Sequence, residues 1–124
     1  MDAGLKEENE ILDLTFRFAT RIVKLSRYLQ QHHKEYVLSK QILRSGTSIG
    51  ANVNEAQAAQ SHKDFLHKMA VASKEARETL YWLRLLMETE YLDASHVSVQ
   101  SLNDELHSIN KILVSIVKTT SKTR

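Results

Sequence analysis

Five polar side chains recur at helical spacing and form the pattern in this sequence that is best suited to chemistry. They are Gln41, Arg44, Ser48, Asn52 and Glu55, separated by three, four, four and three residues. Residues three or four apart lie on one face of a helix, so these side chains would form a single polar stripe. A stripe beside an apolar core is partly desolvated, and its members should hydrogen-bond with one another or with a neighbouring helix. We interpret it first as a network that fixes helix register, and second as an anion-binding groove anchored by Arg44.

Patterns typical of catalysis or metal binding do not accompany this stripe. No histidine lies one helical turn from Ser45 or Ser48, so neither hydroxyl has a neighbouring base. Di-iron bundle sites need Glu-x-x-His on two helices, and no glutamate has a histidine three residues later. The chain has no cysteine, which excludes a thiolate metal site and a cysteine nucleophile. We therefore expect no enzyme activity, no metal and no cofactor.

Basic residues offer a further kind of chemistry, the binding of phosphates. The candidates in the third quarter of the chain and at its end are Lys63, Lys68, Arg77, Arg84, Lys118, Lys122 and Arg124. Acidic residues interleave with those of the third quarter and the net charge is only +2, a mixture typical of a solvated helix face. Assembly of several copies would nevertheless concentrate this charge into a ring that binds RNA or DNA.

Four amphipathic segments must position all of these side chains. Apolar residues recur every three or four positions over residues 11–29, 38–56, 65–87 and 99–116. This spacing turns one face of each segment towards a partner and predicts helices, and no segment alternates with a period of two. The 124 residues are 42% hydrophobic and include no proline and three glycines, which suits a helical globular domain rather than an all-β fold. The apolar runs are too short to span a membrane.

The breaks between these segments carry signals for helix ends. Ser61 is followed by Asp64, which resembles a capping box opening the third helix. Asp93 and Ser95 are candidate caps for the fourth helix. The connections are short, so successive helices should run antiparallel.

The fold class that follows is all-α, an antiparallel up-down-up-down four-helix bundle. We place the bundle at residues 9–118, after a polar N-terminal segment at 1–8 and before a polar tail at 119–124. Gly46 and Gly50 fall within the second helix. Each glycine lowers helix propensity by about 1 kcal/mol relative to alanine, but small residues allow a neighbouring backbone to approach closely.

A second apolar stripe lies away from the predicted core on the first and third helices. Its members are Leu12, Phe16, Val23, Val71, Tyr81, Trp82 and Leu85. Monomers rarely expose such a patch, because each large side chain gains about 1.5–3 kcal/mol on leaving water. The stripe predicts a subunit interface in a closed homo-oligomer. The alternative is that some of these residues lie at the margin of the core.

Three stretches of the sequence resemble the four-helix-bundle family of 23S rRNA-intervening-sequence proteins, sometimes labelled a ribosomal protein family. They are residues 44–56 (RSGTSIGANVNEA), 61–65 (SHKDF) and 74–86 (KEARETLYWLRLL). The resemblance implies a bacterial, cytoplasmic homopentamer with no established enzymatic activity and no agreed binding residues. The family is distantly similar to the accessory protein of diversity-generating retroelements, a pentameric bundle implicated in binding a reverse transcriptase and nucleic acid. That relative is strongly basic, whereas this chain carries a net charge of +2.

Together these features predict a non-enzymatic oligomeric interaction or assembly protein whose first partner is itself. The alternative is an RNA- or DNA-binding accessory protein that acts as a ring-shaped oligomer, alone or with a nucleic-acid enzyme. Neither hypothesis involves a membrane.

Overall fold

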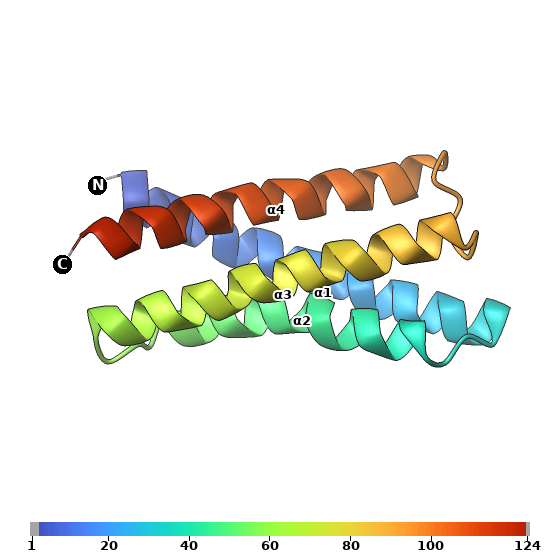
Figure 1. Cartoon of the computed structure of the whole chain (residues 1–124), viewed down its shortest axis with the longest axis horizontal. Helices are drawn as coiled ribbons and strands as arrows, with labels where there is room; N and C mark the ends of the chain where they lie inside the picture. The colour runs from blue at the N-terminus through green and yellow to red at the C-terminus, as the bar shows by residue number, and fades with distance from the viewer. Residues whose placement is uncertain (1–2, 124) are drawn as a thin grey trace.

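Four helices make up the molecule, as the computed structural model of the chain shows (Figure 1). The structure describes residues 3–123, with side chains from Glu10 onward. Helix α1 spans Ala3–His33, α2 spans Leu38–Ala56, α3 spans His62–Glu88 and α4 spans Val97–Lys122. No strand occurs in residues 3–123. The predicted all-α four-helix bundle is confirmed.

The helices pack in cyclic order, so that α1 and α3 lie on one diagonal and α2 and α4 on the other. Contacts join α1 with α2, α2 with α3, α3 with α4 and, least extensively, α1 with α4. Over the described residues, no Cα atom of α1 lies within 8 Å of a Cα atom of α3. Successive helices run antiparallel, which brings the two ends of the chain to the same end of the bundle (Figure 1).

One apolar core runs along the bundle axis. The helical spacing selected most of its members, but it missed Leu86, and it included Leu14, Leu25, Leu80 and Met87, which are only partly buried. The fully buried large side chains come from all four helices: Ile11, Phe18, Ile22, Leu29, Ile42, Ile49, Met69, Leu83, Leu86, Leu106, Ile109 and Leu113. Each helix contributes one stripe at intervals of three and four residues, because a single stripe of a helix can face the axis. Burial of this stripe supplies the main driving force for folding.

The predicted close approach at the second helix occurs between α2 and α1. A Cβ atom on Gly46 would lie 2.8 Å from Cγ2 of Ile22, and one on Gly50 would lie 3.1 Å from the carbonyl oxygen of Thr15. Nearby, the Ser26 hydroxyl donates to the Ser39 carbonyl oxygen at 3.0 Å. The glycines are therefore required by helix packing, and the cost in helix propensity is offset by contact with α1.

Helix ends follow the sequence signals in one case and depart from them in another. Ser61 caps α3, and its side chain accepts from the Asp64 backbone N–H at 3.0 Å, as predicted. The predicted caps of α4 are wrong, because the N-cap is His96, whose Nδ1 accepts from the Ser98 N–H at 3.1 Å. Asp93 and Ser95 instead bond to each other within the preceding turn.

The start of α2 depends on a carboxylate that the sequence patterns did not identify. Glu35 accepts from the backbone N–H groups of Val37, Leu38 and Ser39 at 3.2, 3.0 and 2.7 Å. These donors have no partner inside the helix, and the carboxylate also complements the positive end of the helix dipole. Burial raises the pKa of Glu35, but the bonds from the three N–H groups outweigh it and leave the pKa below its ordinary value of 4.5.

The first and last helices extend beyond residues 9–118. Helix α1 begins at Ala3 rather than after residue 8, and α4 continues to Lys122 rather than ending at 118. At the C-terminal end, His62 Nε2 lies 2.9 Å from the Thr120 carbonyl oxygen, which joins the last turns of α4 to the start of α3. A polar composition therefore does not end this helix. Met1, Asp2 and Arg124 lie outside the described residues.

Candidate functional site

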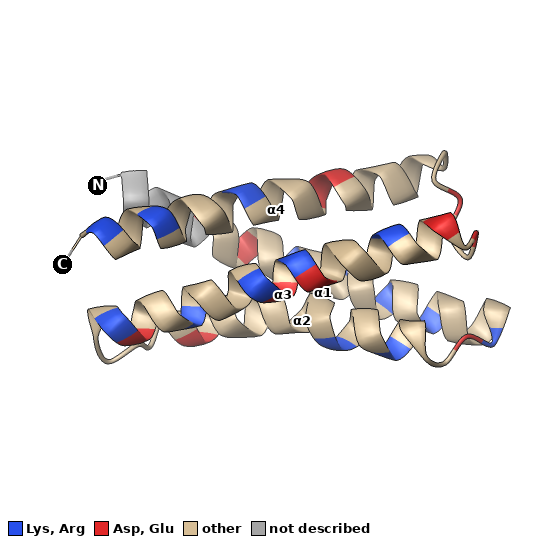
Figure 2. Ribbon diagram, viewed as in Figure 1, with Lys and Arg blue, Asp and Glu red and all other residues tan. Residues whose placement is uncertain are grey.

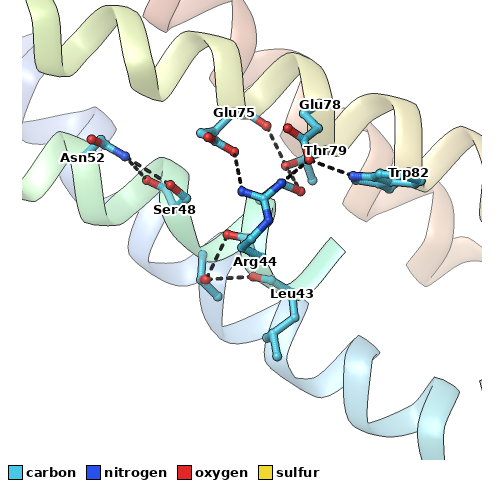
Figure 3. A network of polar contacts seen from close by, with 10 residues as sticks. Leu43, Arg44, Ser48, Asn52, Glu75, Glu78, Thr79 and Trp82 are labelled. Carbon is cyan, nitrogen blue, oxygen red and sulfur yellow. Dashed lines mark hydrogen bonds and ion pairs between the residues drawn. The ribbon is translucent and has the colours of Figure 1, made fainter. Parts of the chain in front are cut away.

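Arg44 in the polar stripe of α2 points towards α3 and lies beside Glu75 and Glu78 (Figure 3). Arg44 forms ion pairs with two carboxylates of α3, one with Glu78 through Nη2 and one with Glu75 through Nη1 at 3.7 Å. Trp82 Nε1 donates to Glu78 Oε2 at 3.1 Å. Spacings of three and four residues on α3 place Glu75, Glu78 and Trp82 on the side of that helix that faces α2.

Glu75 is the unusual member of this cluster because its carboxylate is almost buried. Its side chain is 12% exposed, against 56% for Arg44, and its Oε1 atom has no hydrogen-bond donor in the structure. The 3.7 Å separation from Arg44 is long for a hydrogen bond, so the contact is an ion pair only. Beneath it, Thr79 Oγ1 lies 2.9 Å from Ser45 Oγ and joins the cores of α2 and α3.

The other predicted members of the stripe divide into two groups. Asn52 Nδ2 donates to the Ser48 carbonyl oxygen at 2.8 Å and to its Oγ at 3.1 Å, so these two side chains bond to each other. Glu55 is exposed, and its side chain forms no hydrogen bond or ion pair within the described part of the chain. The structure therefore brings Arg44 together with Glu75 and Glu78 and leaves Glu55 outside.

The charges in the Arg44 cluster favour the network interpretation over an anion site. Two carboxylates face one guanidinium, which leaves an excess of negative charge that would repel an anion. The two serines of this part of α2 have no neighbouring base, because Ser48 is bonded to Asn52 and Ser45 to Thr79. No group of three or more potential metal ligands occurs among residues 10–123.

The predicted interface residues form two separate surfaces. On α1 they are Leu12, Phe16 and Val23, called here the α1 patch; on α3 they are Val71, Tyr81, Trp82 and Leu85, called here the α3 patch. The rings of Phe16 and Tyr81 stand out, with exposed fractions of 73% and 61%. Leu12 and Trp82 are half-buried and pack against the core, so these two lie at its margin. Tyr81 and Trp82 also contact each other edge to face, 5.1 Å between ring centroids.

Both patches flank α2, one on each side. Thr15 and Ser26 of α1 contact α2, and Leu12 and Val23 each precede one of them by three residues. On α3, Trp82 and Leu85 continue the side that carries Glu75 and Glu78. Because α1 and α3 are diagonal, the two patches face different directions and do not merge on one copy.

Two of the predicted nucleic-acid residues lie close together on α4. Lys118 and Lys122, with Lys111, line a shallow hollow of about 310 Å³ that has no acidic residue in its lining. Figure 2 shows the basic segments of α4 towards its C-terminal end and an acidic segment nearer its start. On α3, Lys63 and Arg84 are exposed, Lys68 is half-buried and Arg77 donates to Ser73 Oγ at 3.4 Å. The last predicted residue, Arg124, lies outside the described residues.

Comparisons with known proteins give a consistent result. The sequence model of the family described as 23S rRNA-intervening sequence protein matches residues 7–115. A crystal structure of a protein with unknown function, from the S23 ribosomal protein family of Bacteroides thetaiotaomicron VPI-5482, is 51% identical to this chain. The match has a TM-score of 0.85 and covers 90% of this chain and 98% of the other. No curated protein sequence matches. Among the described helices, none is long and apolar enough to cross a membrane.

Proposed function

The chain belongs to the 23S rRNA-intervening sequence protein family, and we propose that it is a non-enzymatic assembly protein whose copies join in a closed ring. Its solved relative is a protein of unknown function, so support for the proposal comes from the surfaces of this chain. The observation that carries it is the exposure of Phe16 and Tyr81 on two separate faces of one bundle. A ring of five, in the cytoplasm, is what the family resemblance implies.

Two unlike patches favour a head-to-tail contact, in which the α1 patch of one copy meets the α3 patch of the next. Contacts of this kind leave one unused patch on each end of a growing chain of copies. The unused patches disappear only when the chain closes into a ring or continues as a filament. Like-to-like pairing would instead give dimers through either patch.

The charges beside the patches also favour contact between unlike surfaces. Arg27 lies eleven residues after Phe16 on the same side of α1, is exposed, and has no acidic partner within 4.0 Å in the described part of the chain. The α3 patch adjoins Glu75 and Glu78, which exceed Arg44 by one negative charge. Opposite charges steer two surfaces together and disfavour pairing of like surfaces.

Mixing of two interface variants tests this arrangement. Phe16→Glu and Tyr81→Glu each place a charge in one patch, and each variant should be a monomer by light scattering while it keeps the helical signal of the wild type. A mixture of the two still contains one intact α1 patch and one intact α3 patch. In a head-to-tail contact the mixture should therefore form heterodimers and nothing larger.

Other outcomes of the mixing experiment separate the alternatives. A wild-type protein that is monomeric at micromolar concentration would remove the proposal. Monomers that fail to pair on mixing would contradict the head-to-tail contact. A variant that dimerises by itself would instead indicate like-to-like pairing through the patch that it keeps. Val114→Glu is a matched control, because Val114 is an exposed apolar residue outside both patches and its replacement should leave the mass of the particle unchanged.

A second candidate function is nucleic-acid binding, which is supported by the lysines along α4. Lys111, Lys118 and Lys122 line one hollow, and a ring would repeat this surface in every copy. Retention of mixed RNA or DNA by the protein should be strongest at about 50 mM salt and should fall steeply as the salt concentration rises. Charge reversal at Lys118 and Lys122 should remove it without a change in particle mass, and no retention at low salt would exclude this function.

A further inference from the structure

We propose that the cavity between α1, α4 and the α3–α4 connection binds a small organic anion with an apolar, ring-sized body. The cavity has a volume of about 550 Å³, which falls within the range of small-molecule sites. It lies at the end of the bundle opposite the chain termini, where α1 and α4 are joined by few contacts (Figure 1). It is separate from both patches and from the Arg44 cluster.

The lining of the cavity fits an apolar body. Leu25, Leu92, Val99 and Leu102 are its aliphatic members, and Leu92 and Leu102 are 6% and 5% exposed. Tyr28 and Tyr91 add two aromatic rings to the lining. A flat ring bound against these groups would be removed from water and would gain the free energy of apolar burial.

Contacts within the protein hold Tyr28, Tyr91 and the α3–α4 connection in place before any ligand binds. His33 lies between the two tyrosines, with its ring centroid 5.3 Å from that of Tyr28 and 5.5 Å from that of Tyr91. The α3–α4 connection is fixed by Asp93, whose Oδ1 accepts from both the hydroxyl and the N–H of Ser95. These two bonds lower the pKa of Asp93, the hydroxyl bond more than the N–H bond. A preformed site avoids the entropy cost of ordering its walls on binding.

The donors at the rim select a negatively charged group. Lys24 lines the cavity, is exposed, and has no ion-pair or hydrogen-bond partner in the described part of the chain. His96 Nδ1 accepts from the Ser98 N–H, which assigns the ring proton of a neutral His96 to Nε2 and makes that nitrogen a donor.

Two charged groups of the lining are already engaged. Arg21 is paired with Glu105 at 3.1 Å and also donates to the Ser98 carbonyl oxygen, so it joins α1 to α4 beside the cavity. Asp93 accepts from Ser95 and keeps its negative charge, so a bound anion must contact Lys24 and stay away from Asp93. The positive charge available to a ligand is therefore that of Lys24, and a carboxylate or sulfonate is the group that it would bind.

Binding of naphthalene-2-carboxylate, measured by titration calorimetry, tests the assignment against the neutral probe 2-naphthalenemethanol. The carboxylate should bind saturably and more tightly than the alcohol, and added salt should weaken only the carboxylate. Lys24→Ala should weaken the carboxylate about two- to fivefold, as expected for an exposed charge pair, and leave the alcohol unchanged. Lys40→Ala, which removes an exposed lysine of α2 outside the lining of the cavity, should change neither.

A blocking variant and a map of the site complete the test. Val99→Glu puts a carboxylate into the cavity and should weaken the anionic probe about tenfold or more. In the wild type, the amide signals that move on titration should be those of residues 91–93 and 98–102, and this map decides the matter if the variant does not fold. Absence of saturable binding below about 1 mM, or shifts located elsewhere, would overturn the site. Equal binding of the two probes would overturn its preference for anions.

Discussion

The half-exposed guanidinium of Arg44 neutralises the nearly buried carboxylate of Glu75. The exposed fractions of 56% and 12% mean that the guanidinium keeps much of its hydration while Glu75 has lost most of its own. Removal of the cation would leave a buried charge without compensation, which costs more than loss of the contact itself. The ion pair is therefore expected to stabilise the fold mainly by compensating the buried charge of Glu75.

Replacement of Arg44 by methionine should lower the free energy of unfolding by about 1–2 kcal/mol, measured by urea denaturation. Glu75→Gln added to Arg44→Met should recover part of this loss, because a neutral amide is less costly to bury. Arg17→Met is the matched control, since Arg17 and its partner Asp13 are both largely exposed. A cost equal to that of Arg17→Met would show that the Arg44 cluster has no structural role.

Glu35 illustrates a second carboxylate whose charge is used by the fold. Its pKa is lowered, so the stability it contributes is present above the ordinary value of 4.5 and is lost as the pH falls through the lower folded value. Glu35→Gln should cost about 0.5–2 kcal/mol at neutral pH, as for loss of a helix cap. The difference from the wild type should shrink as the pH falls from 6 to about 3, followed by urea denaturation at each pH.

Glu55→Gln provides the comparison for this experiment, because Glu55 is exposed and its side chain forms no hydrogen bond in the described part of the chain. It should change stability little at any pH. A gap between wild type and Glu35→Gln that stays constant down to pH 3 would contradict the role assigned to the Glu35 charge.

The packing of α2 against α1 explains why a helix contains glycine in its interior. Glycine is ordinarily unfavourable there, yet a Cβ on Gly46 would meet two atoms of the Ile22 side chain at 2.8 and 2.9 Å. Atoms this close must move apart, and Cγ atoms next to the backbone cannot move freely. Helix propensity and helix packing therefore make opposite demands at this position, and packing prevails.

Gly46→Ala should consequently destabilise the protein by about 1–3 kcal/mol in thermal or urea unfolding, against the gain of about 1 kcal/mol that propensity alone predicts. Gly50→Ala should be milder, since its Cβ would meet the Thr15 backbone at 3.1 Å rather than below 3.0 Å. A stabilising Gly46→Ala would mean that α1 and α2 can separate freely.

Across the whole bundle, side chains at the axis are fully buried, whereas some apolar side chains on the outer faces are largely exposed. Leu83 is fully buried, whereas Tyr81, two residues away on the same helix, is 61% exposed. Leu83→Ala should lower the free energy of unfolding by about 2–5 kcal/mol at a fixed protein concentration. Tyr81→Glu should leave the circular dichroism spectrum of the folded chain unchanged and alter only the mass of the particle. Similar loss of helicity in both variants would contradict the assignment of inside and outside.

The pattern of residue types was sufficient to establish the helices and the faces they bury. Apolar residues at intervals of three and four identified the buried stripes, including Ile42, Leu83 and Ile109, because burial on one side of a helix leaves that period in the sequence. Ser61 and Asp64 marked a helix start because a cap depends on residues close together in the chain.

Features that depend on which helices are neighbours could not be obtained in this way. The spacing of apolar residues indicates which side of a helix faces the core, but it does not indicate which neighbouring helix covers that side. The pairing of Arg44 with Glu75 and Glu78, the different directions of the α1 and α3 patches, and the cavity beside Lys24 all required the cyclic order of the four helices. Local composition also failed at His96 and Glu35, where the cap is chosen by the path of the connection rather than by the preference of one residue type.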